Sequence, residues 1–217
     1  MPKRALAQHR PWLFASILAA TLFYFLRDDE IGGIQLMVLK AAGVGFLAAY
    51  ALHRARCADA RLMALVMALS ALGDALIEIS FIAGGGSFLL SHLAAITLYL
   101  RNRRTHPTSS QKLAATALLV ATPLVSWLLS SGDWGVTFYS LGLGAMACFA
   151  WLSRFPRYRV GTGAVLFVIS DWLIFSQVGF IGENPVAHWL IWPLYYGGQF
   201  MIATGVVQTL RHEKVVA

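Results

Sequence analysis

Residues 163–180 read GAVLFVISDWLIFSQVGF, an apolar run whose length indicates a membrane-spanning helix. One charged residue, Asp171, interrupts this run. Residues 63–80, MALVMALSALGDALIEIS, repeat the arrangement with Asp74 inside the run and Glu78 near its end. Runs of this length approach the roughly 20 residues that a helix needs to cross a bilayer. A carboxylate at the bilayer centre costs about 2.5–3.5 kcal/mol on insertion scales, so such a residue usually marks a functional site.

The composition of the whole chain is that of an integral membrane protein. Its 217 residues are 58% hydrophobic and 12% charged, whereas soluble domains carry roughly 25% charged residues. The net charge of +7 does not indicate a nucleic-acid partner, because the basic residues stand in short turns between apolar segments. We attribute them to membrane topology and to attraction for anionic lipid head groups.

Apolar segments separated by short polar turns predict eight transmembrane helices in a single domain over residues 1–217. The expected ranges are 11–27, 32–53, 61–81, 86–101, 112–131, 134–153, 160–181 and 186–210. The N-terminal segment is interpreted as the first span and not as a signal peptide, because no convincing cleavage site follows its apolar core. The expected fold class is all-α, a polytopic transmembrane bundle of eight helices.

The basic residues occupy alternate turns of this bundle. Of the 17 Lys and Arg residues, 15 fall before the first helix, in the second, fourth and sixth turns, or after the last helix. The intervening turns carry mainly acidic residues, namely Asp28, Asp29, Glu30, Asp133 and Glu183, with Arg27. The positive-inside rule then predicts that both termini are cytoplasmic, in a multi-pass protein of the bacterial inner membrane.

Four ionisable groups are predicted at similar depths. At 1.5 Å per residue, Asp74 lies ~20 Å and Asp171 ~18 Å from the basic surface. From the opposite surface, Lys40 lies ~15 Å and His92 ~9 Å deep. In a core of about 30 Å, all four fall in one slab roughly 9–15 Å below the outer surface. Groups this costly to insert must face one another or water, and not lipid.

Neighbouring polar residues extend the set of candidates. Ser70, Asp74 and Glu78 are spaced four apart, so they form one stripe along a helix. Structural roles also remain open at this point. A Lys40–Asp74 ion pair could simply join two helices, Glu78 could lie at the membrane interface, and His92 could be a helix-packing hydrogen-bond partner.

Two carboxyl groups in unequal surroundings can divide into an acid and a base. Such a pair suits acid-catalysed cleavage of an ether-like C–O bond, and it equally suits a proton relay in a transporter. The sequence contains no G-x-S-x-G, HExxH or P-loop motif. Its scattered histidines and two cysteines do not have metal-ligand spacing. We therefore expect neither a metal nor a cofactor.

Four short motifs carry a family resemblance. They are SALGD at 70–74, GGGSFLLSH at 84–92 with Tyr99 beyond it, GAVLFVISD at 163–171 and YYGGQ at 195–199. In the order and helix placement of these motifs, the chain resembles the YhhN-type lysoplasmalogenase family of eight-helix membrane proteins. One departure is that Lys40 is followed by Ala41, where the family often has proline.

The resemblance implies an ether-bond hydrolase that cleaves the vinyl ether bond of lysoplasmalogens to a fatty aldehyde and a glycerophospho-base. One of Asp74 and Asp171 would be the general acid, and the other would stabilise the cation and activate water. Lys40 would fix the carboxylate charge or contact the substrate phosphate. The other expected substrate-binding residues are Ser70, His92, Tyr139, Ser170, Tyr195 and Gln199.

The expected partners are a lysophospholipid substrate and membrane lipids, without nucleic acid, and the oligomeric state is open. A competing interpretation is a proton-coupled transporter or binding protein for lysolipids or other amphiphiles. A third interpretation is a structural bundle without a ligand. An assay for aldehyde release separates the first interpretation from the other two.

Overall fold

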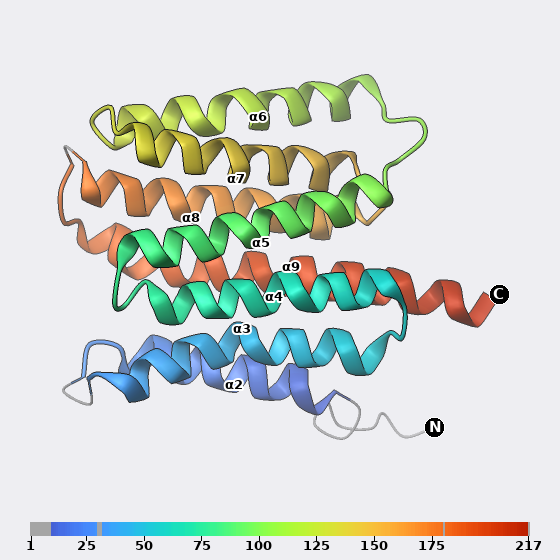
Figure 1. Cartoon of the computed structure of the whole chain (residues 1–217), viewed down its shortest axis with the longest axis horizontal. Helices are drawn as coiled ribbons and strands as arrows, with labels where there is room; N and C mark the ends of the chain where they lie inside the picture. The colour runs from blue at the N-terminus through green and yellow to red at the C-terminus, as the bar shows by residue number, and fades with distance from the viewer. Residues whose placement is uncertain (1–9, 30–31, 180, 217) are drawn as a thin grey trace. The chain divides into compact units, whose positions relative to one another are not determined.

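In the computed structural model, residues 10–29, 32–179 and 181–216 are described, with side chains as far as Arg211. They form eight α-helices and one π-helical turn (Figure 1). The elements are α2 (Pro11–Leu26), α3 (Ile34–Arg54), α4 (Ala58–Leu76), α5 (Phe81–Arg101), α6 (Ser109–Leu129), α7 (Trp134–Leu152), η1 (Arg157–Gly161), α8 (Thr162–Val178) and α9 (Pro185–Val216). The all-α class and all eight predicted helices are confirmed, and no β-strand occurs among the described residues.

Most of the helical segments have the length and apolar composition of membrane spans. Five segments are long and apolar enough to cross a bilayer, namely Ile34–Arg54, Phe81–Arg101, Ser109–Leu129, Trp134–Leu152 and Arg157–Val178. Large apolar side chains on α6 are exposed, including Leu113, Val120 and Leu124. Such a face is unfavourable in water but matches the hydrocarbon of a bilayer. The chain is a multi-pass membrane protein.

Two predicted boundaries, at the end of α4 and the start of α5, differ from the structure by five residues each. Helix α4 ends at Leu76 where residue 81 was expected, and α5 begins at Phe81 where residue 86 was expected. Gly84 supplies the physical reason, because a Cβ there would lie 2.7 Å from the Ile77 Cα. The missing side chain lets the start of α5 pack tightly against the end of α4. His92 therefore lies ~16 Å from the start of its helix, and the predicted ~9 Å was wrong.

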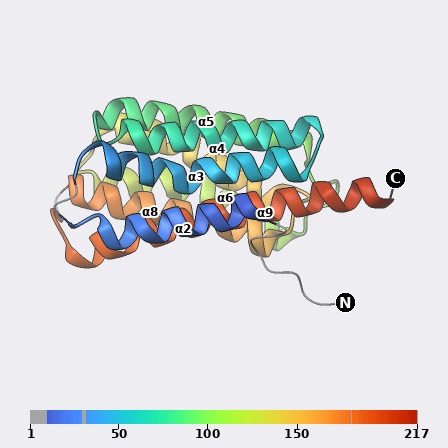
Figure 2. The ribbon, with the colours of Figure 1, turned by 90° about the horizontal axis from the view of Figure 1, so that it is seen from below.

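The chain divides into two compact units. The first unit extends to Ser91 and includes the C-terminal end from Leu210, and the second unit is His92–Thr209. In the first unit, α3 lies between α2 and α4 (Figure 1 and Figure 2). Ser16 Oγ on α2 donates to the Gly43 carbonyl oxygen on α3 at 2.6 Å. Polar contacts between helices of this kind stabilise a bundle in lipid.

In the second unit, α6, α7 and α8 pack against one another. Asp133 caps α7 by accepting a hydrogen bond from the Val136 N–H at 2.9 Å, which satisfies a free donor of the first turn. The preceding turn reverses the chain through Ser131 and Gly132, both with positive φ angles of 59° and 87°. This turn sets α7 antiparallel to α6 and presents the Tyr139 face of α7 to α8.

A glycine crossing fixes α8 against α9. A Cβ on Gly163 would lie 2.7 Å from the Gly198 carbonyl oxygen, and a Cβ on Gly198 would lie 2.6 Å from that of Gly163. Small residues at both positions let the two backbones touch. One turn further along α8, the Phe167 ring packs 5.1 Å from the ring of Tyr195 on α9. The crossing therefore positions the predicted site residues of α9 beside the helix that carries Asp171.

Candidate active site

A hydrogen-bonded chain of three side chains lies inside the second unit. Tyr139 Oη on α7 donates to Asp171 Oδ2 on α8 at 2.8 Å, and His92 Nε2 on α5 lies 3.1 Å from the same phenolic oxygen. Because the one phenolic proton goes to Asp171, the His92 contact needs a proton on Nε2, which donates to Tyr139. Asp171 is 5% exposed and His92 1%. Buried polar groups are normally hydrogen-bonded, and here the bonds orient the carboxylate.

The carboxylate keeps one oxygen for other contacts. Among the described residues, Tyr139 is the hydrogen-bond partner of Asp171, and it contacts Oδ2. A carboxylate can accept up to about four hydrogen bonds through its two oxygens. Oδ1 is therefore available to a substrate or to a transferred proton.

Aromatic rings enclose this carboxylate. Phe167, Asp171 and Phe175 are spaced four apart on α8, so the carboxylate emerges between two rings. The Phe167 ring lies 5.2 Å from His92, and the Phe175 ring lies 5.9 Å from Tyr139, both edge to face. Such arrangements are favourable for aromatic pairs. They also surround Asp171 with low-polarity material, in which electrostatic interactions are strong.

Three further predicted residues lie on α8 and α9 of the same unit. Ser170 Oγ donates to the Ile191 carbonyl oxygen at 3.0 Å, so its hydroxyl joins α8 to α9. Tyr195 and Gln199 are 5% and 1% exposed and lie one helical turn apart on α9. Substrate contact by these three residues remains a prediction.

Asp74 and Ser70 lie in the first unit, on neighbouring turns of α4. Asp74 is 2% exposed. Ser91 Oγ on α5 donates to the Val66 carbonyl oxygen at 3.0 Å, so the 2.8 Å contact between the Ser70 and Ser91 hydroxyls takes its proton from Ser70. These bonds hold α5 close to the face of α4 that carries Asp74. The joint action of Asp74 and Asp171 on one substrate remains a prediction.

Lys40 has a partner other than the one that its sequence position suggested. Its Nζ lies 2.5 Å from Glu78 Oε1, two residues beyond the end of α4. The same Nζ lies 5.7 Å from the centroid of the Phe23 ring. The side chains of Lys40 and Glu78 are 17% and 46% exposed. The ion pair that joins α3 to the end of α4 is therefore Lys40–Glu78, and not the alternative Lys40–Asp74 pair.

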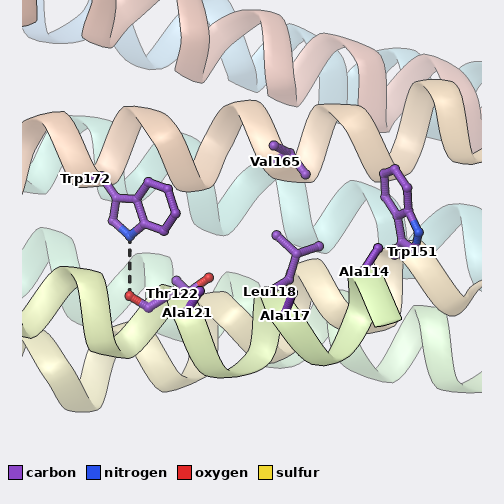
Figure 3. Close-up of a pocket in the computed structure, with 8 residues that line it drawn as sticks. All are labelled: Ala114, Ala117, Leu118, Ala121, Thr122, Trp151, Val165 and Trp172. Carbon is purple, nitrogen blue, oxygen red and sulfur yellow. Dashed lines mark hydrogen bonds between the residues drawn. The ribbon is translucent and has the colours of Figure 1, made fainter. Parts of the chain in front are cut away.

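An apolar groove of about 280 Å³ lies among α6, α7 and α8 of the second unit (Figure 3). It is lined by Ala114, Ala117, Leu118, Ala121, Thr122, Trp151, Val165 and Trp172. The three alanines fall on one face of α6 and leave the hollow that larger side chains would fill. Trp172 Nε1 closes one end by donating to the Thr122 carbonyl oxygen at 3.3 Å. The lining suits a hydrocarbon chain, and Trp172 directly follows Asp171 in the chain.

The structure brings together three of the residues that the sequence named separately. The side chains of His92, Tyr139 and Asp171 are linked by hydrogen bonds in the second unit, whereas Lys40 pairs with Glu78 in the first unit. Sequence reasoning placed Phe167 on the Asp171 face of its helix but missed Phe175, although its spacing of four from Asp171 was a usable signal. No sequence signal identified Tyr139 as the partner of Asp171, because the two residues lie on different helices.

The comparisons with known proteins agree with these motifs. The model of the YhhN family matches residues 35–206. Proteins named lysoplasmalogenase from Mycobacterium bovis and Mycobacterium tuberculosis are each 34% identical over 194 residues, covering 82% of this chain and 73% of theirs. No solved structure matches the chain significantly. The family match spans all the candidate residues from Lys40 to Gln199, and the chain belongs to the YhhN family.

Proposed function

We propose that this protein hydrolyses the vinyl ether bond of lysoplasmalogens within the bacterial inner membrane. The products are a fatty aldehyde and a glycerophospho-base. The observation that carries the proposal is the buried Asp171 carboxylate, oriented by Tyr139 among aromatic rings, in a chain with lysoplasmalogenase relatives. A buried acid on α8, the helix whose Val165 and Trp172 line an apolar groove, supports a substrate whose reactive bond lies just below a lipid head group.

The chemistry begins with a proton transfer to carbon. The general acid protonates the β-carbon of the vinyl ether; the C=C π electrons form the new C–H bond, and the ether oxygen shares a lone pair to give an oxocarbenium ion. General acid catalysis by a positioned side chain contributes typically about 10²–10⁴-fold. The electron-rich faces of Phe167 and Phe175 are suited to stabilise the cation.

Water then completes the cleavage. It adds to the α-carbon and loses a proton to the second carboxylate, which yields a hemiacetal. The hemiacetal then collapses as its C–O bond to glycerol breaks. The second carboxyl group gives its proton to the departing glycerol oxygen, and the hemiacetal hydroxyl becomes the aldehyde carbonyl as its proton returns to the general acid. One water is consumed, and both carboxyl groups return to their starting states.

The residues divide the work as follows. Asp74 and Asp171 share the roles of acid and base, and Tyr139 and His92 hold Asp171 in position. Lys40 contacts the phosphate, and Ser70, Ser170, Tyr195 and Gln199 are the other proposed substrate-binding residues. The groove beside Trp172 takes part of the alkenyl chain, because its lining is apolar.

The test uses three lysolipids that differ in one bond. Purified protein in detergent is incubated with 1-alkenyl, 1-alkyl and 1-acyl lysolipids of the same head group, and aldehyde and fatty acid are quantified. We expect aldehyde from the alkenyl lipid alone, because the alkyl ether has no double bond to protonate. Fatty acid from the acyl lipid would identify an esterase, and tight binding without turnover would identify a carrier.

A further inference from the structure

The Lys40–Glu78 ion pair lies near the start of α3 and the end of α4 in the first unit. Lys40 is six residues into α3, or ~9 Å from the start of that helix, and not the ~15 Å expected from the sequence. Glu78 follows the end of α4, one turn beyond Asp74, and nearly half of its side chain is exposed. The pair is therefore accessible from this end of the unit, in contrast to the buried Asp74.

A zwitterionic phospho-base has the same two charges as this pair. Its phosphodiester is an anion that a lysine ammonium can bind, and its ammonium is a cation that a carboxylate can bind. The pair and the head group are each neutral overall. Exchanging the internal ion pair for two pairs with the head group thus leaves no uncompensated charge near the membrane, where such a charge is costly.

The contacts around Lys40 favour such an exchange. Partly exposed ion pairs are weak, so the internal pair can open without a large loss of stability. The buried Phe23 ring lies 5.7 Å from Lys40 Nζ and gives that ammonium a cation–π contact besides its ion pair with Glu78. The Arg27–Asp28 pair belongs to the same unit, at the end of α2, but joins chain neighbours at 3.5 Å.

We infer that Lys40 and Glu78 form a head-group site for zwitterionic lysolipids, in which Lys40 binds the phosphate and Glu78 binds the ammonium of choline or ethanolamine. The site rests on the proposed function for the identity of the lipid. It adds Glu78 as a specificity-determining residue. Opening of the ion pair is the step that admits the head group, and the bond to be cleaved then lies deeper, toward Asp74.

The test measures binding without turnover. Affinities of 1-alkyl lysophosphocholine and 1-alkyl lysophosphatidic acid, which has no ammonium, are determined for the purified protein in detergent. We expect Glu78→Gln to weaken lysophosphocholine binding about fivefold, the size of a partly exposed charge pair, and to spare lysophosphatidic acid. Lys40→Gln should weaken both lipids. Asp28→Asn is the matched control and should change neither.

Two outcomes would overturn the inference. One is that Glu78→Gln weakens both lipids equally, and the other is that it changes neither. If that variant does not fold, the double variant Lys40→Glu with Glu78→Lys is used instead. It keeps an internal ion pair but exchanges the positions of the positive and the negative side chain. Wild-type head-group preference in the double variant would also contradict the inference, because it would assign the pair a purely structural role.

Failure of the inference is distinguishable from failure of the proposed function. If the wild-type protein releases no aldehyde from alkenyl lysolipids, the proposed function is wrong, and the binding comparison still tests the head-group site. If aldehyde is released but Glu78→Gln does not alter head-group preference, the head-group site alone is wrong.

Discussion

Two acidic side chains of this protein, one in each unit, differ in their surroundings. In the second unit, Asp171 is buried among aromatic rings and bonded to the neutral Tyr139. In the first unit, Glu78 is half exposed and bonded to the charged Lys40. A buried carboxylate with a neutral partner keeps its position and can exchange a proton, whereas an exposed ion pair can exchange partners. Burial and the kind of partner therefore separate a chemical role from a recognition role.

The largest expected effect tests the chemical side of this comparison. Asp171→Asn keeps the shape of the side chain but cannot transfer the proton, so aldehyde release should fall by about 10²–10⁴-fold. Asp74→Asn should have an effect of the same order. The rate of aldehyde formation by purified protein is the measurement. Full activity in either variant would remove that aspartate from the mechanism.

Tyr139→Phe tests whether the partner of Asp171 matters. A hydrogen bond to a charged group contributes about 1.5–3 kcal/mol, so kcat should fall roughly 10- to 150-fold while KM changes little. Tyr158→Phe in the same unit removes a phenol from an exposed ring and serves as the matched control. Equal losses in the two variants would show that the Tyr139 hydroxyl does not act through Asp171.

A pair of glycine variants tests the scaffold that places α9 beside Asp171. Gly198→Ala puts a Cβ 2.6 Å from the Gly163 carbonyl oxygen and should destabilise the protein by about 1–3 kcal/mol. Gly197→Ala meets no atom within 4 Å and should be neutral or stabilising. Thermal unfolding in detergent compares them. Similar unfolding temperatures would contradict the close crossing of α8 and α9.

A second pair of glycine variants makes the same comparison in the first unit. The Cβ of Gly84→Ala would lie 2.7 Å from the Ile77 Cα, whereas the Cβ of Gly85→Ala would have no such neighbour within 4 Å. We expect Gly84→Ala to lower the unfolding temperature and Gly85→Ala to leave it unchanged or raise it. Loss of stability at position 84 with little loss at position 85 would confirm the tight return of α5 onto α4.

The smallest effect is expected at His92, which contacts Asp171 only through Tyr139. His92→Phe keeps the ring contact with Phe167 and removes a hydrogen bond worth about 0.5–1.5 kcal/mol, so kcat should fall roughly two- to tenfold. In a Tyr139→Phe background, His92→Phe should lower kcat very little further, because the hydrogen bond between the two residues is already absent. Additive losses would assign His92 a role of its own.

Sequence patterns predicted most of the architecture and the residue types of the candidate site. All eight helices and the polar positions Asp74 and Asp171 follow from local signals. The boundary between α4 and α5 was misplaced, because three glycines look like a turn when a tight helix contact is not foreseen. Lys40 was assigned to Asp74 in one interpretation, since both lie in the membrane and Glu78 looked interfacial.

The membrane class, the helix count and the polar residues within apolar segments can be read from the amino-acid sequence alone. They can be read there because bilayer thickness, helical rise and insertion cost act on each segment separately. Only the tertiary structure decided that Tyr139 holds Asp171 and that Lys40 pairs with Glu78. Those pairings depend on how each helix is rotated toward its neighbours, and side-chain packing between distant segments sets that rotation.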